Sequence, residues 1–296
     1  MHFLVIYNRS VLSSLLLNLI IGINKQILRV VLIDINLLKL MFYMNGGVII
    51  SIKSYNKKAV VSGDIIEIYE YKKDVLYDYK DTKNTRKGRQ SIAKYEDKLL
   101  NRKKTLQRNR RDIRRLVNCN IQDNSKFITL TFADNITDLK LANYEWKKFK
   151  QRLETKIGYK LQYLVVIEFQ KRGAIHYHCV MFNLPYVQNK DLSAIWKNGF
   201  VKINRIDNVD NVGAYVCKYI TKDNDDDRLA GQKMYFTSRG LKKPIEIKDE
   251  RAVDSLVASL PSEACVYDAV FENEYNSISY KQYNLNSLRS QKQNVT

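Results

Sequence analysis

The feature that most constrains the fold of this chain is a regular alternation of strand-like and helix-like segments between residues 125 and 222. A two-residue apolar repeat predicts a strand, and a helical repeat predicts a helix. In chain order the segments are strand, helix, strand, strand, helix, strand and helix, at residues 126–132, 138–158, 163–169, 174–183, 189–199, 200–206 and 211–222. This order predicts an α+β fold: a ferredoxin-like split βαβ with a central antiparallel sheet and helices on one face.

Two local patterns support this prediction. The segment 138–158 is amphipathic, with one apolar stripe formed by Leu139, Ala142, Trp146, Phe149 and Leu153. The strands at 163–169 and 174–183 are separated by QKRG, a connection of hairpin length that contains glycine. We therefore expect these two strands to be antiparallel neighbours.

The first 44 residues differ from the rest of the chain. Their longest uncharged apolar run is VLSSLLLNLIIGI, about 13 residues, whereas a membrane-spanning helix needs ~20. We expect residues 1–44 to be a hydrophobic extension outside the mature protein, with Met41 or Met44 as the start. A membrane-associated segment is the alternative.

The remaining chain divides by composition. Residues 45–82 contain VIISIK and DIIEIYEY, which predict a short β region. Residues 83–120 predict a basic helical segment that contacts phosphates, because 83–118 hold 14 basic and three acidic residues. We expect a domain over residues 121–248 and a C-terminal segment over 249–296, whose end is disordered.

The charge and the cysteines limit the classes of partner and compartment. Fifty Lys and Arg against 31 Asp and Glu give a formal charge of +19. Such a charge attracts polyanions, so nucleic acid is the first expected partner and an anionic membrane surface the second. The four cysteines are scattered singly, without a CxxC pair, which argues against a disulfide framework or structural zinc and favours a reducing, cytoplasmic location.

Two of the three histidines of the chain stand one residue apart, at His176 and His178. On a strand both side chains share one face, where two imidazoles can bind one metal ion. If the hairpin turns about Arg172, Glu168 lies directly opposite His176. Two imidazoles and a carboxylate suit a divalent cation such as Mg²⁺ or Mn²⁺ that also accepts a phosphate oxygen, and zinc is chemically possible. A solvated polar face on a half-buried strand is the alternative.

A pair of tyrosines follows on the predicted helix 211–222. Tyr215 and Tyr219 are spaced i, i+4, and each is followed three residues later by a lysine, Lys218 and Lys222. A phenol with a pKa near 10 loses its proton at a cost of about 4 kcal/mol at pH 7, and a nearby ammonium lowers that cost. The pattern therefore favours a tyrosine nucleophile, with packing of both rings into the core as the alternative.

Three segments in this order, FITLTF, HYHCVMF and AYVCKYITK, resemble motifs one, two and three of the HUH endonuclease superfamily, specifically rolling-circle replication initiators. The two tyrosines with a lysine after each are similar to the gene A initiators of small icosahedral phages. The downstream MYFTSRGLKKP is similar to proteins grouped with the filamentous-phage gene II family. The resemblance covers roughly residues 125–245 and implies an HUH endonuclease domain within 121–248.

The resemblance implies a role for each of these residues. His176 and His178 match the metal ligands of the superfamily, and Glu168 matches the acidic third ligand. Tyr219, with Lys222, matches the nucleophile, and Tyr215, with Lys218, matches its partner in the two-tyrosine pattern. The implied activity is metal-dependent, site-specific nicking and rejoining of single-stranded DNA at a replication origin through a 5′-phosphotyrosine.

The implied reaction stores the bond energy covalently, which agrees with the absence of a GxxxxGK[ST] phosphate loop from the sequence. A host helicase and a DNA polymerase are then the expected partners. An HUH transposase or relaxase of a mobile element is the alternative within the superfamily. A non-catalytic basic protein that binds nucleic acid is the alternative outside it.

Overall fold

The computed structural model describes residues 53–77, 95–206, 211–221 and 232–287. The chain forms two compact units, a first unit made of residues 1–81 and 244–296 and a second unit made of residues 82–243. The predicted extension 1–44 and the nine last residues lie outside the described residues. Within the described part of the chain, no helix is both long and apolar enough to cross a membrane.

The second unit is built on a five-stranded antiparallel sheet in the order β6-β3-β5-β4-β7. Its strands are β3 (Lys126–Phe132), β4 (Tyr163–Phe169), β5 (Ile175–Met181), β6 (Gly199–Arg205) and β7 (Tyr235–Thr237). Strand β5 lies between β3 and β4, which is the split βαβ arrangement that the element order predicts. The predicted α+β class is confirmed.

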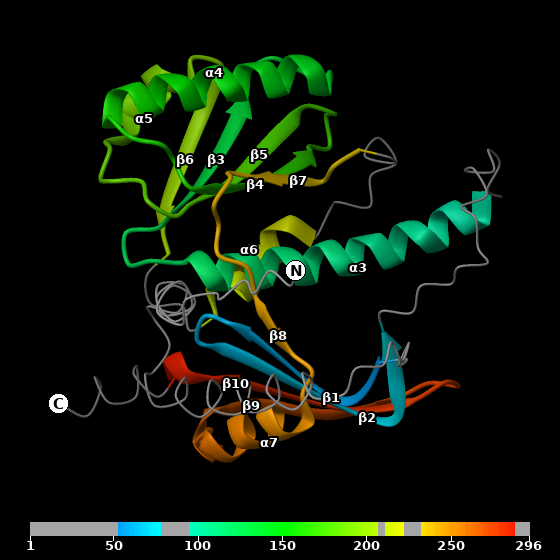
Figure 1. Cartoon of the computed structure of the whole chain (residues 1–296). Coiled ribbons are helices and arrows are strands. Elements are labelled where there is room, and N and C mark those ends of the chain that lie inside the picture. The colour runs from blue at the N-terminus through cyan, green and yellow to red at the C-terminus, as the bar shows by residue number, and fades with distance from the viewer. Residues whose placement is uncertain (1–52, 78–94, 207–210, 222–231, 288–296) are drawn as a thin grey trace, which may run out of the picture. The chain divides into compact units, whose positions relative to one another are not determined.

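The helices of this unit cover both faces of the sheet, so the prediction that they pack on one face is wrong (Figure 1). They are α3 (Tyr95–Asn120), α4 (Leu139–Ile157), α5 (Asn189–Trp196) and α6 (Val212–Thr221). Helices α4 and α5 pack on one face, and α3 and α6 pack on the other. The physical reason is that strands such as YLVVIEF are apolar on both sides, and both sides must be covered.

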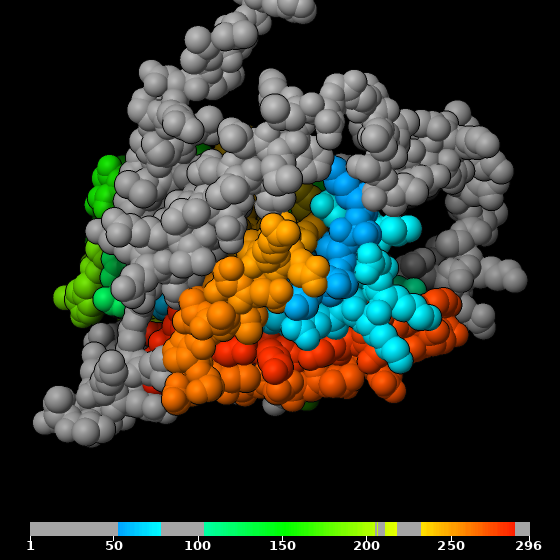
Figure 2. All heavy atoms as spheres, turned by 60° about the horizontal axis from the view of Figure 1, so that its bottom comes forward, coloured from blue at the N-terminus to red at the C-terminus, as the bar shows by residue number. Residues whose placement is uncertain are grey.

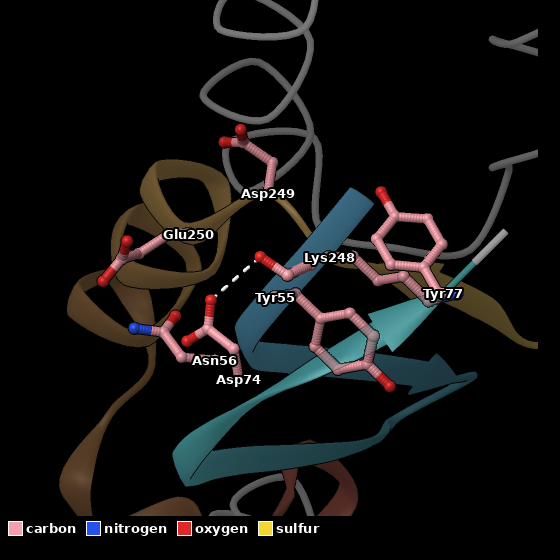
Figure 3. Close-up of a pocket in the computed structure, with 8 residues that line it drawn as sticks. Tyr55, Asn56, Asp74, Tyr77, Lys248, Asp249 and Glu250 are labelled. Atoms are coloured by element: carbon pink, nitrogen blue, oxygen red, sulfur yellow. Dashed lines mark hydrogen bonds between the residues drawn. The ribbon is translucent and has the colours of Figure 1, made fainter. Parts of the chain in front are cut away.

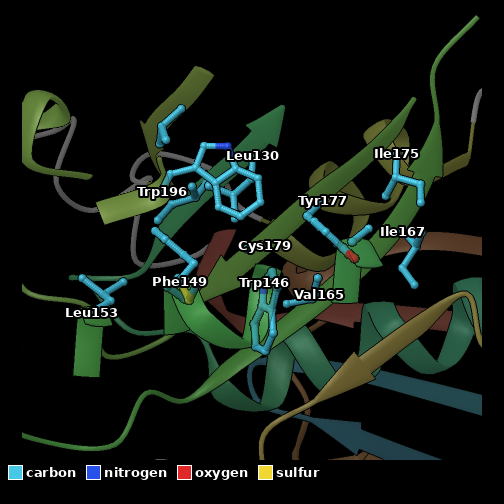
Figure 4. Packing of buried hydrophobic residues seen from close by; sticks show 14 of the residues in the cluster. Leu130, Trp146, Phe149, Leu153, Val165, Ile167, Ile175, Tyr177, Cys179 and Trp196 are labelled. Carbon is cyan, nitrogen blue, oxygen red and sulfur yellow. The ribbon is translucent and has the colours of Figure 1, made fainter. Parts of the chain in front are cut away.

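The face under α4 and α5 holds the larger core (Figure 4). Four members of the predicted stripe are buried, and Leu139 is partly buried. Phe149 packs edge-on against Trp196 of α5, with ring centroids 5.7 Å apart. Helix α4 begins after Asp138, whose carboxylate accepts the Lys140 N–H at 2.8 Å, and ends at Gly158, whose left-handed φ of 81° terminates the helix.

The first unit joins segments from the two ends of the chain in one sheet. Its antiparallel strands run in the order β8-β1-β2-β10-β9. They are β1 (Lys53–Ser62), β2 (Ile65–Tyr77), β8 (Ile245–Ile247), β9 (Cys265–Glu272) and β10 (Ser277–Asn284). The predicted segment DIIEIYEY falls on β2, whereas VIISIK lies almost wholly outside the described residues. Residues 45–82 and 249–296, expected as separate regions, thus contribute to one unit.

Helix α7 (Glu250–Ser259), followed by a 3₁₀ turn at Ser262–Ala264, covers one face of this sheet. In Figure 2 the helix, in orange, lies against the blue and red strands. Val253 and Leu256 pack there against Ile66 and Ile68 of β2. The Asp249 carboxylate caps the helix by accepting the Ala252 N–H at 2.9 Å. The other face of the sheet therefore has no part in this core.

A buried carboxylate makes the stability of the second unit depend on pH. Glu154 at the end of α4 is only 8% exposed and accepts hydrogen bonds from the Leu161 N–H at 3.1 Å and from Lys150 and Lys160, each at 3.2 Å. Burial raises the pKa of the Glu154 carboxyl, but these donors more than offset it, so the pKa lies below its ordinary value. The ionised carboxylate thus stabilises the folded state.

We predict that Glu154→Gln lowers the unfolding free energy of the second unit by about 1–3 kcal/mol at pH 7. Because the folded pKa is lowered, this difference is fully present above the unfolded pKa and shrinks as the pH falls through the folded pKa. Urea unfolding at pH 7 and pH 3 measures it, with the exposed turn residue Asp123→Asn as the control. A Glu154→Gln deficit that is equal at both pH values would contradict the argument.

Candidate metal centre and tyrosine helix

The hairpin formed by β4 and β5 sets the register of the predicted metal ligands. It turns about Arg172, and Glu168 pairs directly with His176, as the sequence predicts. Gly173 has a φ of 94°, and the Gln170 N–H donates to the Ala174 carbonyl at 2.8 Å. The Arg172 guanidinium donates to the backbone carbonyls at the end of β3, which fixes the turn to the neighbouring strand.

Three side chains converge on one face of the sheet. The ligand atoms of Glu168, His176 and His178 all lie within 4.8 Å of one another. The rings of the two histidines are nearly perpendicular, with centroids 6.0 Å apart. The His178 Nε2 also contacts the Glu168 carboxylate directly. Such a set of two imidazoles and one carboxylate is a donor set that divalent cations accept.

The orientation of His178 is set by residues of β3. Its Nδ1 lies 3.3 Å from the Thr129 hydroxyl, and its ring stacks on Phe127 with an interplanar angle of 13°. These contacts direct the opposite nitrogen, Nε2, towards Glu168. A second hydrogen bond of this kind is what orients histidine ligands in metal sites.

The buried imidazole of His176 fits a metal ligand better than a packing residue. Among the residues that the structure describes, its Nε2 is buried and has no hydrogen-bond partner. Burial, and then the neighbouring His178, lower the pKa of His176 from 6.5 to about 4, so the ring is neutral at physiological pH. A buried polar atom without a partner is costly, and a metal ion would satisfy it.

Helix α6, which carries the two tyrosines, packs on the same face of the sheet as the histidines. Val212 and Val216 are buried in a cluster with Val166 and Val180 of the two hairpin strands. Tyr215 is partly buried and packs against this cluster. The sheet face that presents the three ligands is therefore the face that holds the tyrosine helix.

A close crossing of α3 and α6 fixes the tyrosine helix in place. The Gly213 N–H donates to the Asn118 side chain of α3 at 2.8 Å. A Cβ added at Gly213 would lie 2.4 Å from the Arg114 carbonyl and 2.5 Å from the Asn118 oxygen. Only glycine allows the two helices to approach this closely.

The structure describes some of the predicted tyrosine and lysine residues only in part. Tyr219 and Lys218 lie in α6, but their side chains are outside the described residues, and so is Lys222. Their catalytic roles therefore stay predictions. The sequence reasoning missed Thr129 and Asn118. The alternation in FITLTF places Thr129 on the ligand face, but its pairing with His178 depends on a strand register that β3 alone does not reveal.

The comparisons with known proteins concern this part of the chain. Residues 125–224 match the model of the family described as replication-associated protein ORF2/gene II protein. The chain is also 32% identical over 126 residues to the phasyl DNA replicon protein arp of Escherichia coli, in an alignment that covers 33% of this chain and 44% of that protein. No solved structure matches the chain.

The matched segment runs from the start of β3 to just beyond α6, so it contains the three convergent ligands and both tyrosines. Both comparisons support a replication-associated family for this segment. Helix α3 and the whole first unit lie outside it. The chain spans less than half the length of the curated relative that it matches.

We predict that the protein binds one Mn²⁺ ion at this centre. Because each ligand supplies one of three donor atoms, His176→Ala, His178→Ala and Glu168→Ala should each weaken binding by more than about tenfold, and Thr129→Val by about tenfold. Titration calorimetry or Mn²⁺ spin resonance measures the affinity, and His2→Ala, which removes the third histidine of the chain, is the matched control. Wild-type affinity in His176→Ala would exclude this centre.

We also predict that Gly213→Ala destabilises the second unit, by about 1–3 kcal/mol, because the added methyl group forces α6 away from α3. Helix propensity alone predicts the opposite sign, since alanine favours a helix by roughly 1 kcal/mol over glycine. The sign of the change in urea unfolding therefore separates a close crossing from a propensity effect. A stabilised variant would show that the helices do not cross as described.

Proposed function

We propose that this chain initiates rolling-circle DNA replication by nicking and rejoining one DNA strand at a replication origin. The observation that carries the proposal is the convergence of Glu168, His176 and His178 within 4.8 Å on the sheet face that packs the tyrosine helix. The match of residues 125–224 to a replication-associated family supports the same reading.

The residues would divide the chemistry between them. Glu168, His176 and His178 would hold a divalent cation such as Mg²⁺ or Mn²⁺, which supplies Lewis-acid polarisation of the scissile phosphate when bound. The phenol oxygen of Tyr219 attacks phosphorus and forms a 5′-phosphotyrosine bond. The bond to the 3′-oxygen breaks, the phenol proton leaves to solvent and the 3′-oxygen takes up a proton. Lys218 and Lys222 stabilise the phenolate and the developing negative charge.

The covalent link makes the reaction reversible. Attack of a 3′-hydroxyl on the phosphotyrosine rejoins the strand and releases the tyrosine, so no nucleotide hydrolysis is needed. Tyr215, one helical turn before Tyr219, would provide a second nucleophile for the regenerated junction. The released 3′-hydroxyl primes a host polymerase, and a host helicase unwinds the duplex.

DNA would be held in part by α3. Four basic side chains in the described part of this helix are exposed: Lys104, Arg108, Arg110 and Arg111. Contacts of such side chains to phosphates position a nucleic acid without reading its sequence. The non-catalytic alternative accounts for this helix, but it does not account for a buried His176 nitrogen without a partner among the described residues.

We predict that the full-length protein forms a covalent adduct with labelled origin-bearing single-stranded DNA in Mn²⁺, seen after denaturing electrophoresis. Tyr219→Phe removes the attacking oxygen, so it should abolish or strongly reduce the adduct, and Tyr215→Phe with Tyr219→Phe should abolish it. Chelation of the metal and His176→Ala should abolish it as well. The control is Tyr144→Phe, an exposed tyrosine on α4.

Two results would contradict the assignment. An adduct that persists in the double tyrosine variant would place the nucleophile elsewhere in the chain. An adduct of wild-type yield in chelator would remove the metal from the reaction. Loss of the adduct in Tyr144→Phe would indicate a general effect on the fold.

A further inference from the structure

The face of the first-unit sheet opposite α7 carries a row of aromatic side chains, which we call the aromatic face. Its members are Tyr55, Tyr69, Tyr71, Tyr267, Phe271 and Tyr280. Alternation places them there, because Ile66, Ile68 and Tyr283 pack towards α7 and the register pairs Tyr69 with Tyr280.

The rings form a continuous series across four strands. Tyr69 lies 5.0 Å from Tyr280 and 6.4 Å from Tyr71, measured between ring centroids. Tyr280 in turn contacts Tyr267 at 5.8 Å and Phe271 at 6.3 Å. At ~4.8 Å between strands, the row from β1 to β9 extends about 15 Å. Four-stranded sheets with such aromatic side chains stack about two or three bases.

The centre of the row is held rigidly. The Tyr69 and Tyr280 hydroxyls both donate to the Glu67 carboxylate, at 3.2 Å and 3.0 Å. Glu67 itself is only 1% exposed. A buried carboxylate is retained only where hydrogen bonds satisfy it, so these two rings have fixed positions before any ligand binds. A rigid platform loses less conformational entropy on binding.

Positive charge lies beside the rings. The Lys58 ammonium is 4.9 Å from the Tyr69 ring centroid. The Lys248 ammonium is 4.5 Å from the Tyr77 ring and 5.4 Å from the Tyr55 ring. Aromatic rings beside ammonium groups match a strand of nucleic acid, in which bases alternate with phosphates.

An acidic pocket limits the row at the β1 end (Figure 3). It has a volume of about 380 Å³, with Tyr77 and Lys248 on one side and three acids on the other, Asp74, Asp249 and Glu250. These carboxylates repel phosphates. The favourable surface for a nucleic acid therefore runs from this pocket towards β9, where Tyr267 is 48% and Phe271 is 50% exposed.

We propose that the aromatic face binds single-stranded DNA by base stacking. A duplex cannot offer base faces to such a surface, whereas every unpaired base can stack on it. The proposal goes beyond the nicking reaction, since it needs neither the metal ligands nor the tyrosines of α6. It also concerns residues outside the segment that matches the replication-associated family.

The test compares two 20-mers of equal charge, oligo(dT) and an abasic oligomer, by fluorescence anisotropy on the full-length protein. Chelator is present and Tyr215 and Tyr219 are both changed to Phe, so failure of the nicking chemistry cannot affect the result. Phosphate contacts are the same for both oligomers, so the ratio of their dissociation constants reports stacking alone. We expect the parent protein to prefer oligo(dT) by about tenfold or more.

The substitutions are Tyr267→Ala with Phe271→Ala, and the matched control is Val270→Ala. Val270 lies on the same strand, is 63% exposed and points to the opposite face by alternation. The double variant should lose most of the preference for oligo(dT), and the control should keep it. Tyr267→Leu with Phe271→Leu retains apolar area without aromatic rings and should also lose it.

Several outcomes would overturn the proposal. They are no preference of the parent protein for oligo(dT), an unchanged preference in the double alanine variant, and an equal loss in Val270→Ala. Retention in the double leucine variant would indicate an apolar docking surface for a protein instead. Tighter binding of oligo(U) than of oligo(dT) would assign the face to RNA. Crosslinking of iododeoxyuridine to β9 or β10 would support it independently.

Discussion

The register of the β4–β5 hairpin is the constraint on which the candidate site depends. Side chains alternate along a strand, so a slip of one residue would turn His176 and His178 into the core under α4 and would turn Tyr177 out of it. Tyr177 is fully buried, and its hydroxyl donates to Asn143 at 2.8 Å, which makes the slipped register costly. Core packing on one face thus fixes the ligand geometry on the other.

The ligand face is completed by a helix outside the segment that matches the replication-associated family. Ile113 and Val117 of α3 lie in the same cluster as Val212 and Val216 of α6. Asn118 of α3 accepts the Gly213 N–H, so α3 sets the position of the helix that carries the tyrosines. Without α3 the apolar cluster on this face would be open to water. The unit formed by residues 82–243, rather than the matched segment alone, is therefore the one that builds the site.

Sequence alone predicted what local rules determine. Periodicity gave the order of strands and helices, and the symmetry of the hairpin about Arg172 gave the pairing of Glu168 with His176. It did not predict helices on both faces, because strand patterns show that a face is apolar but not which helix covers it. It also missed the first-unit sheet, whose β2 and β10 are joined by contacts such as Lys73 to Asn276, 203 residues apart. Pairing over such a separation leaves no local signal.

The two units offer two kinds of surface, and the difference follows from the chemistry of a DNA strand. A phosphate is recognised by charge, and its reaction needs a cation held by polar groups in a site largely closed to water, as around His176. A base is recognised by its face and edges, and stacking needs open, rigid aromatic rings such as Tyr267 and Tyr280. One surface cannot satisfy both demands, because burial that suits the first would exclude the bases from the second. A protein that cuts one strand at a phosphate and also holds that strand by its bases therefore gains from two separate units.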